Sequence, residues 1–258
     1  MTDFPTPNFS TDLSGQVALV TGTTAGLGRR FALVLASCGA KVAITGRRTE
    51  RLEALAQEIS ALGGESVSLH LDMMDTESIL SVVKQTEEAL GPISILVNNA
   101  GIPDAQRAHK MSLELTDAVF DTNLRGPWVL SCEVARRMIE HKIPGRMVNI
   151  SSIGGFHYAG NGAALYSVTK AAIVRMTEAL AVEWARYNIN VNAIAPGAFS
   201  SEMMDGMIGR MGDFTQQFPR KRLCDPAQMD STLLFLVSPS SECVTGTYIK
   251  IDDGQGSR

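Results

Sequence analysis

The segment Val17-Ala-Leu-Val-Thr-Gly-Thr-Thr-Ala-Gly-Leu-Gly28 places three glycines directly after a short apolar run and ahead of a helical pattern. Glycines at a strand-to-helix turn let the backbone approach a pyrophosphate closely, and the N-terminus of the following helix offers free amide donors. The spacing is Gly-x3-Gly-x-Gly rather than the commoner Gly-x-Gly-x-x-Gly, and a glycine trio can also form an ordinary turn. Its position after a first strand favours dinucleotide binding by Gly22, Thr23, Thr24, Gly26, Leu27 and Gly28.

Short apolar runs recur along the chain and alternate with segments of helical pattern. Runs that are apolar on both faces are typical of a buried parallel sheet, whose strands need helical crossovers. No repeat and no Pro/Ser-rich linker divides the chain. The pattern predicts an α/β fold, a single doubly wound Rossmann-type domain with a parallel seven-stranded sheet flanked by helices. The expected strands are 17–21, 41–45, 66–71, 93–97, 146–150, 190–194 and 247–251.

The domain is expected over residues 15–258, after a loose N-terminal arm at residues 1–14. The arm has neither a basic region nor an apolar run, so it does not read as a signal peptide. Charges interrupt every apolar stretch before it reaches the length of a membrane span. The four cysteines are scattered, which suits reduced thiols. We therefore expect a cytoplasmic protein without a membrane partner.

Charge and histidine placement narrow the function further. The net charge of −4 argues against binding to nucleic acid, and no basic stripe interleaved with aromatic residues is present. The four histidines are dispersed and are not paired with cysteines, so no metal site is expected.

The end of the second strand bears on the choice of cofactor. NAD-selective sites place a carboxylate there to bind the adenosine ribose hydroxyls. Here a glycine is followed by Arg47 and Arg48, whose guanidinium groups can bind a 2′-phosphate. Alternatively, this is a solvated helix start at which Arg48 or Arg51 pairs with Glu50 or Glu53. The pattern favours NADP(H), with NAD(H) as the alternative.

Tyr166 and Lys170 lie four residues apart in a helical segment and so share a helix face. An ammonium beside a phenol favours the phenolate, which would lower the tyrosine pKa from its usual value of about 10. Such a phenol can act as a general acid–base near neutral pH. The spacing alone also fits an ordinary surface pair.

Further motifs follow the later strands. Asn98-Asn-Ala-Gly101 comes after the fourth strand, Asn149-Ile-Ser-Ser152 ends the fifth, and Pro196-Gly197 comes after the sixth. Asn123-Leu-Arg-Gly126 lies in the helix between the fourth and fifth strands. With the glycine turn and the Tyr166–Lys170 pair, this ordered set resembles the short-chain dehydrogenase/reductase family, notably its 3-oxoacyl-carrier-protein reductase-like branch.

The resemblance implies a catalytic set. Ser152 would hydrogen-bond the substrate oxygen, while Ser151 would face into the packing. Tyr166 would exchange a proton with that oxygen as hydride passes to or from the nicotinamide. Lys170 would lower the pKa of Tyr166 and bind the nicotinamide ribose. Asn123 would hold a water that links Lys170 to solvent.

Pro127 lies four residues after Asn123 and cannot donate to its carbonyl, so we expect a helix kink there. We hypothesise that the freed carbonyl accepts the relay water. The alternative is a kink that serves packing only.

By position in the family pattern, further residues are expected around the cofactor. Asp72 and Met73 would lie near the adenine, and Ser201 would stand where the family usually has a threonine that binds the carboxamide. Asp253 has no inherited role, and we expect it to be exposed. The remaining cofactor contacts implied are Asn99, Ala100, Gly101, Tyr166, Lys170, Pro196 and Gly197.

The substrate is less well defined. Residues 200–223 are expected to form a lid, rich in methionine and phenylalanine, that would suit a partly apolar substrate. An ordinary amphipathic helix packed on the core is the alternative. Ser152, His157, Tyr166 and Phe199 are the candidate substrate contacts, although His157 also fits a plain surface position.

We expect an oxidoreductase that transfers a hydride between NADP(H) and a small-molecule carbonyl or secondary alcohol, that is, a carbonyl reductase. The alternatives are an NAD(P)-dependent polyol, sugar-acid or hydroxysteroid dehydrogenase, and a non-enzymatic dinucleotide-binding scaffold. By resemblance, the expected assembly is a homotetramer, with a dimer as the alternative.

Overall fold

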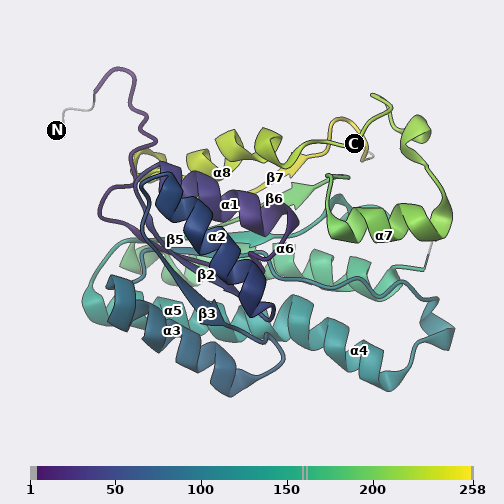
Figure 1. The fold of residues 1–258 in the computed structure, drawn as a ribbon, viewed down its shortest axis with the longest axis horizontal. Coiled ribbons are helices and arrows are strands. Elements are labelled where there is room, and N and C mark those ends of the chain that lie inside the picture. The colour runs from purple at the N-terminus through teal and green to yellow at the C-terminus, as the bar shows by residue number, and fades with distance from the viewer. Residues whose placement is uncertain (1–4, 159, 161, 257–258) are drawn as a thin grey trace.

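The structure, a computed structural model, describes residues 5–158, 160 and 162–256. Seven parallel strands form one sheet in the order β3-β2-β1-β4-β5-β6-β7 (Figure 1). The predicted doubly wound Rossmann-type fold is confirmed. The strands are β1 (Val17–Val20), β2 (Lys41–Gly46), β3 (Ser66–His70), β4 (Ile95–Asn98), β5 (Gly145–Ile150), β6 (Ile189–Pro196) and β7 (Tyr248–Ile251).

Helices cover both faces of the sheet (Figure 1). One face carries α1 (Gly26–Ser37), α2 (Thr49–Ala61) and α8 (Asp230–Val237). The other carries α3 (Thr76–Leu90), α5 (Gly126–His141) and α6 (Ala164–Trp184). The remaining helical segments are α4 (Leu113–Phe120), α7 (Glu202–Met211), η1 (Ala108–Lys110), η2 (Asp121–Arg125), η3 (Ile153–Gly155), η4 (Ala185–Tyr187), η5 (Thr215–Gln217), η6 (Pro226–Met229) and η7 (Pro239–Ser241).

Successive residues of the central strands enter opposite cores. In β1, Ala18 and Val20 pack with α1, α2 and α8, while Val17 and Leu19 pack with α3, α5 and α6. A strand buried on both faces needs apolar residues at every position, which explains the continuous apolar run. The sheet is thereby fixed from both sides, and the loops at its carboxyl edge start from rigid positions.

The N-terminal arm joins the core before the expected domain start at residue 15. Leu13 is completely buried in the cluster formed by α1, α2 and α8. Its amide donates to the Cys38 carbonyl at 2.7 Å, and the Ser238 hydroxyl donates to the Ser10 carbonyl at 2.7 Å. The end of the arm therefore packs as part of the fold.

Within the described residues, none of the helices has both the length and the apolar character that crossing a membrane requires. The same residues contain no group of three or more His, Cys, Asp or Glu side chains placed to hold a metal ion.

Candidate active site

A cavity of about 1280 Å³ opens at the carboxyl ends of the strands, between the loops that follow them and helix α7. Most of the site residues expected from the sequence line it, while Thr23, Gly28 and Asn123 lie behind its wall. The expected residues that line the cavity are Gly22, Thr24, Gly26, Leu27, Arg47, Arg48, Asp72, Met73, Asn99, Ala100, Gly101, Ser152, His157, Tyr166, Lys170, Pro196, Gly197, Phe199 and Ser201.

Close packing explains two of the three glycines in the turn after β1. A Cβ on Gly28 would lie 2.3 Å from both the Gly22 carbonyl oxygen and Asn99 Nδ2. Gly22 has φ +70°, and a Cβ there would lie 2.9 Å from Ala100 Cα. Side chains at either position would displace backbone. Thr23 serves the same turn, since its hydroxyl donates to the Thr45 carbonyl at 3.2 Å.

The N-terminus of α1 faces the cavity without a side-chain cap. Its N-cap residue, Ala25, offers no hydrogen-bonding side chain, and Gly26 and Leu27 line the cavity. The first amides of a helix have no partners within the helix, and the helix dipole favours an anion there. The glycine cradle and these amides therefore fit the pyrophosphate of a dinucleotide.

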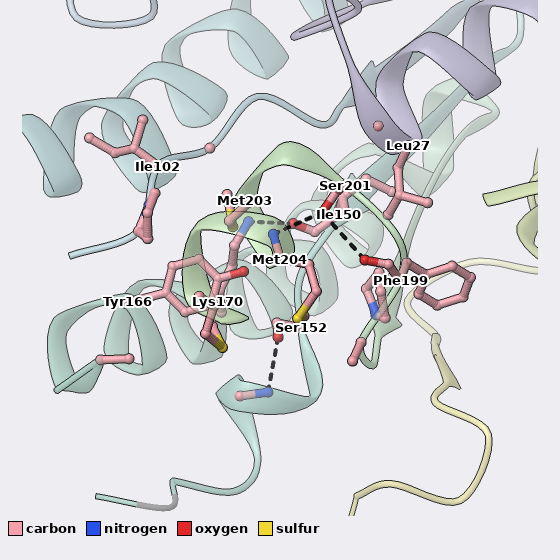
Figure 2. Close-up of a pocket in the computed structure, with 18 of the residues that line it drawn as sticks. Leu27, Ile102, Ile150, Ser152, Tyr166, Lys170, Phe199, Ser201, Met203 and Met204 are labelled. Carbon is pink, nitrogen blue, oxygen red and sulfur yellow. Dashed lines mark hydrogen bonds between the residues drawn. The ribbon is translucent and has the colours of Figure 1, made fainter. Parts of the chain in front are cut away.

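Ser152, Tyr166 and Lys170 converge on one part of the cavity, with Met203 and Met204 of α7 around the same space (Figure 2). Lys170 is only 4 % exposed, and its Nζ donates to the Ile150 carbonyl at 2.8 Å. The same Nζ lies 5.5 Å from the centroid of the Tyr166 ring. The Ser152 hydroxyl accepts from the Gly154 amide at 3.0 Å, which orients it at the end of β5.

Ser151 also borders the cavity, but its side chain is packed against α6, as expected. It is 2 % exposed, and its hydroxyl donates to the Lys170 carbonyl at 2.7 Å. The end of β5 and helix α6 are thus joined by two bonds of opposite direction, one from Ser151 and one from the Lys170 ammonium.

We expected Lys170 to lower the pKa of Tyr166, but the surrounding groups of the protein raise it. Burial raises the pKa of Tyr166; the Ser152 hydroxyl lowers it, and the charge of Asp104 raises it further. Burial also lowers the pKa of Lys170 to about 8, so its ammonium is less available to favour the phenolate. The four-residue spacing of Tyr166 and Lys170 predicts that they share a helix face, but it does not predict the burial that shifts their pKa values.

Asn123 lies in η2, a π-helical turn that directly precedes the proline-containing start of α5. Its side-chain amide bonds both backbone groups of Ile102: Oδ1 accepts at 2.8 Å and Nδ2 donates at 2.9 Å. A Cβ on Gly101 would lie 3.3 Å from Asn123 Oδ1 and 3.5 Å from Lys170 Nζ, so both side chains approach the same glycine. Asn123 therefore supports the loop beside Lys170, and its role in holding a water stays a prediction.

Asp104 is a site residue that the sequence motifs did not reveal. It is 2 % exposed, lines the cavity, and accepts hydrogen bonds from the amides of Leu165 and Tyr166 at 2.9 and 3.1 Å. It thus caps the N-terminus of α6 from a loop 61 residues earlier in the chain. The only feature of the sequence that points to Asp104 is its position three residues after the Asn98–Gly101 motif.

The arginines after β2 pair with a carboxylate that the sequence did not suggest, while binding of a 2′-phosphate by Arg47 and Arg48 stays a prediction. Arg48 donates to the Thr24 hydroxyl at 3.0 Å and pairs with Glu202 at 2.9 Å. Arg51 pairs with the other oxygen of Glu202. The expected pairing with Glu50 or Glu53 is therefore replaced by a bridge to α7, and Arg47 remains exposed at the cavity.

All the methionines and phenylalanines of the segment 200–223 line the cavity. None of the α7 residues is buried, so the alternative of an ordinary core helix does not hold. Ser201 caps α7, since its hydroxyl accepts from the Met204 amide at 3.2 Å and donates to the Phe199 carbonyl at 3.3 Å (Figure 2). The residues of this segment that line the cavity are Ser201, Glu202, Met203, Met204, Met207, Arg210, Met211, Phe214, Gln217 and Phe218.

The candidate substrate contacts outside this segment differ in exposure. Phe199 is 3 % exposed and forms part of the cavity wall, while His157 is exposed at its rim.

Asp253 is not the exposed residue that we expected. Its side chain is 11 % exposed and pairs with Arg220 at 2.9 Å and with Arg222 at 2.8 Å. The two arginines hold its pKa below the usual range of a carboxyl group, with the hydrogen bond from Arg222 as the largest cause. These pairs join the end of segment 200–223 to the turn after β7.

A sequence model of the family described as short chain dehydrogenase matches residues 16–209. The 3-oxoacyl-(acyl-carrier-protein) reductase FabG of Aquifex aeolicus is 37 % identical over 245 residues, which cover 94 % of this chain and 98 % of that protein. A short-chain type dehydrogenase/reductase from Mycobacterium marinum has a similar structure, with a TM-score of 0.92, 32 % identity, and coverage of 96 % of this chain and 98 % of that one. The actinorhodin polyketide ketoreductase, solved with NADPH, has a TM-score of 0.90 and 31 % identity, and the match covers 94 % and 98 % of the two chains.

Proposed function

The chain belongs to the short-chain dehydrogenase/reductase family, in its FabG-like branch, and from this premise we propose that it transfers a hydride between NADP(H) and a ketone or secondary alcohol. The observation that carries the proposal is the convergence of Ser152, Tyr166 and Lys170 in the cavity that the glycine turn also lines. A binding scaffold without activity would not need an oriented hydroxyl, a phenol and a buried lysine together at one site.

Bound NADP(H) would supply or accept the hydride. The Ser152 hydroxyl, oriented by the Gly154 amide, would bind the substrate oxygen. The Tyr166 phenol would give its proton to that oxygen during reduction and take it back during oxidation. Because burial raises the pKa of Tyr166, the phenol stays protonated at neutral pH, which suits reduction.

Lys170 would serve the same site in two ways. Its ammonium, which the Ile150 carbonyl holds beside Gly101, would bind the ribose hydroxyls of the cofactor. With a pKa of about 8, it can also pass a proton toward Tyr166. We propose that a water near Asn123 completes this route to solvent.

A preference for NADP(H) is supported by the end of β2. The glycine there leaves the position without a carboxylate, and Arg47 and Arg48 line the cavity beside it. The structural neighbour solved with NADPH is consistent with this preference. Asp72, Met73 and the backbone at Asn99 to Gly101 would surround the adenosine half.

The substrate that we propose is a partly apolar ketone or its alcohol. Segment 200–223 would act as the lid over the nicotinamide end, and it presents four methionines to the cavity. Methionine side chains adapt to varied apolar shapes. Phe214 and Phe218 pack edge to face beside them, with ring centroids 5.7 Å apart.

We also propose that the protein assembles as a homotetramer. Large apolar side chains lie on the outer faces of α5 and α6, where Trp128, Val168 and Val182 are 47, 56 and 82 % exposed. Burial of such side chains between subunits is favourable. Light scattering during gel filtration measures the mass of the assembly, and a dimer would contradict the proposal.

The function is tested with a panel of ketones and alcohols assayed with NADPH and NADH. The panel includes acyl ketones of increasing length, polyols, sugar acids and hydroxysteroids. We expect NADPH-dependent reduction of apolar ketones. Tyr166→Phe should lose at least about 10²-fold in turnover, while NADPH binding, followed by fluorescence, should change less than about twofold. Full activity of that variant would rule out the proposed acid–base.

A further inference from the structure

We infer that Glu202 lowers the preference of this site for NADP(H) by competing with the 2′-phosphate for Arg48 and Arg51. The inference rests on the proposed function, in which Arg48 faces the adenosine ribose. It adds a residue that lies in the lid segment, 154 positions from Arg48 in the chain.

Arg48 links three parts of the cavity wall. It extends from the start of α2, donates to the Thr24 hydroxyl of the glycine turn at 3.0 Å, and pairs with Glu202 at 2.9 Å. Both Arg48 and Glu202 line the cavity. The guanidinium therefore lies over the glycine turn, at the side where β2 ends.

The position of Glu202 is fixed by the backbone that precedes it. Glu202 is the first residue of α7, directly after the capping residue Ser201. A Cβ on Gly26 would lie 3.2 Å from Ser201 Cβ, so the start of α7 packs against the glycine turn itself. The carboxylate is thus presented to the arginines by a helix end that is in contact with the dinucleotide cradle.

Charge makes this arrangement sensitive to a phosphate. The hydrogen bonds from Arg51 and Arg48 lower the pKa of Glu202, so it stays ionised at neutral pH. A 2′-phosphate that reaches the same guanidinium groups must displace the carboxylate or lie beside a like charge. A cofactor without that phosphate can leave the bridge intact.

The bridge is weak enough to be exchanged. The side chains of Arg48, Arg51 and Glu202 are 45, 48 and 52 % exposed, and ion pairs in such positions contribute little to stability. The carboxylate therefore reduces the advantage of NADP(H) without abolishing it. In effect, α7 supplies from the lid the acidic group that NAD-selective sites carry at the end of the second strand.

Two fragments of the cofactor isolate this effect from catalysis. Adenosine 2′,5′-bisphosphate carries the 2′-phosphate, and adenosine 5′-monophosphate lacks it. Calorimetric titration of both into the wild type and Glu202→Gln measures binding without turnover. We expect the variant to bind the bisphosphate about three- to tenfold more tightly, since one ionic competitor is removed. Binding of the monophosphate should change by less than about twofold.

Asp205→Asn is the matched control, because Asp205 is exposed on the same helix and the variant removes the same charge. It should leave both affinities within about twofold of the wild type, since a charge away from the arginines is screened. In the Arg48→Ala/Arg51→Ala background, Glu202→Gln should also change bisphosphate binding by less than about twofold, because additivity fails for residues in contact. Equal tightening of both fragments, an equal effect of Asp205→Asn, or an unchanged effect without the arginines would overturn the inference.

The same titrations separate this inference from the proposed cofactor. Suppose that the wild type binds the two fragments equally and that Glu202→Gln creates a preference for the bisphosphate. The competition by Glu202 is then supported, and the proposed NADP(H) preference is contradicted. If the wild type prefers the bisphosphate and Glu202→Gln leaves that preference unchanged, the NADP(H) preference is supported and the competition by Glu202 is contradicted.

Discussion

The carboxylate of Asp104 accepts a hydrogen bond from the backbone amide of Tyr166 at 3.1 Å. Its other contacts are the amides of Leu165 and Ala105, at 2.9 and 2.8 Å. A buried loop residue thus holds the main chain of the proposed acid–base and places a negative charge near its phenol. The hydrogen bonds of Asp104, which position Tyr166, and its charge, which raises the Tyr166 pKa, can therefore be tested separately.

Asp104→Asn should keep the cap and remove the charge. Because the charge of Asp104 raises the pKa of Tyr166, the phenol of the variant should ionise at lower pH. Alcohol oxidation needs the phenolate, so the acidic limb of its kcat/KM profile should move to lower pH. Asp104→Ala instead removes the side-chain acceptor of all three amides, which should cost at least about 1–3 kcal/mol in unfolding free energy. An Asn variant with the wild-type pH profile would contradict the electrostatic role.

Lys170 should make the stability of the protein depend on pH in the mildly alkaline range. Burial lowers its pKa to about 8 from the ordinary 10.5, so between these values the unfolded chain binds more protons than the folded one. Stability from this group therefore rises with pH above about 8. Relative to Lys170→Met, the wild type should gain on the order of 1–2 kcal/mol between about pH 7.5 and 9.5 in urea unfolding. Lys110→Met, at an exposed position, should show no such pH-dependent difference.

Gly28→Ala should damage the dinucleotide cradle. The added methyl would meet the Gly22 carbonyl oxygen at 2.3 Å, and backbone must move to accept it. We expect a loss of about 1–3 kcal/mol in unfolding free energy and at least about tenfold weaker NADPH binding. Gly209→Ala adds the same methyl in the last turn of α7, where nothing lies within 4 Å, and it should not destabilise the protein. Equal stability of the two variants would show that the turn tolerates a side chain.

Leu13→Ala should reveal that the end of the N-terminal arm belongs to the core. Leu13 is completely buried, and truncation of such a side chain costs about 2–5 kcal/mol. Phe9, four residues earlier in the arm, is 50 % exposed. Phe9→Ala should therefore change the unfolding free energy by less than about 0.5 kcal/mol. Chemical denaturation of the two variants measures the difference, and a small effect at Leu13 would mean that the arm is dispensable.

The strands were predictable because burial on both faces imposes apolar residues throughout, but their ends were less so. The sequence predicts a fourth strand over residues 93–97, and Ile93 is indeed buried at 1 % exposure, but β4 begins at Ile95. An apolar pattern reports burial, whereas a strand is defined by its hydrogen bonds to a neighbour. The glycine turn and the pair Tyr166 and Lys170 could be predicted because the residues of each motif lie within a few positions of one another in the sequence.

Other contributions depend on contacts between distant segments. Asp104 caps a helix 61 residues away, and Glu202 meets an arginine 154 residues away. Neither forms a motif with its neighbours in the chain. The Tyr166 pKa has the same origin, since burial raises it, the Ser152 hydroxyl lowers it, and the charge of Asp104 raises it further. Short-range spacing identified the reacting groups, but the groups that tune them are specified by the fold.

The paired bonds between the end of β5 and α6 also bear on how such a protein can be redesigned. Ser151 and Lys170 tie the strand to the helix from both directions, while segment 200–223 is anchored elsewhere, through Arg48 and Asp253. The proton-transfer groups on α6 and the apolar segment 200–223 are thus held in place by separate sets of contacts. Exchange of the wall segment with that of a relative can alter which ketone is accepted while the proton-transfer groups keep their places.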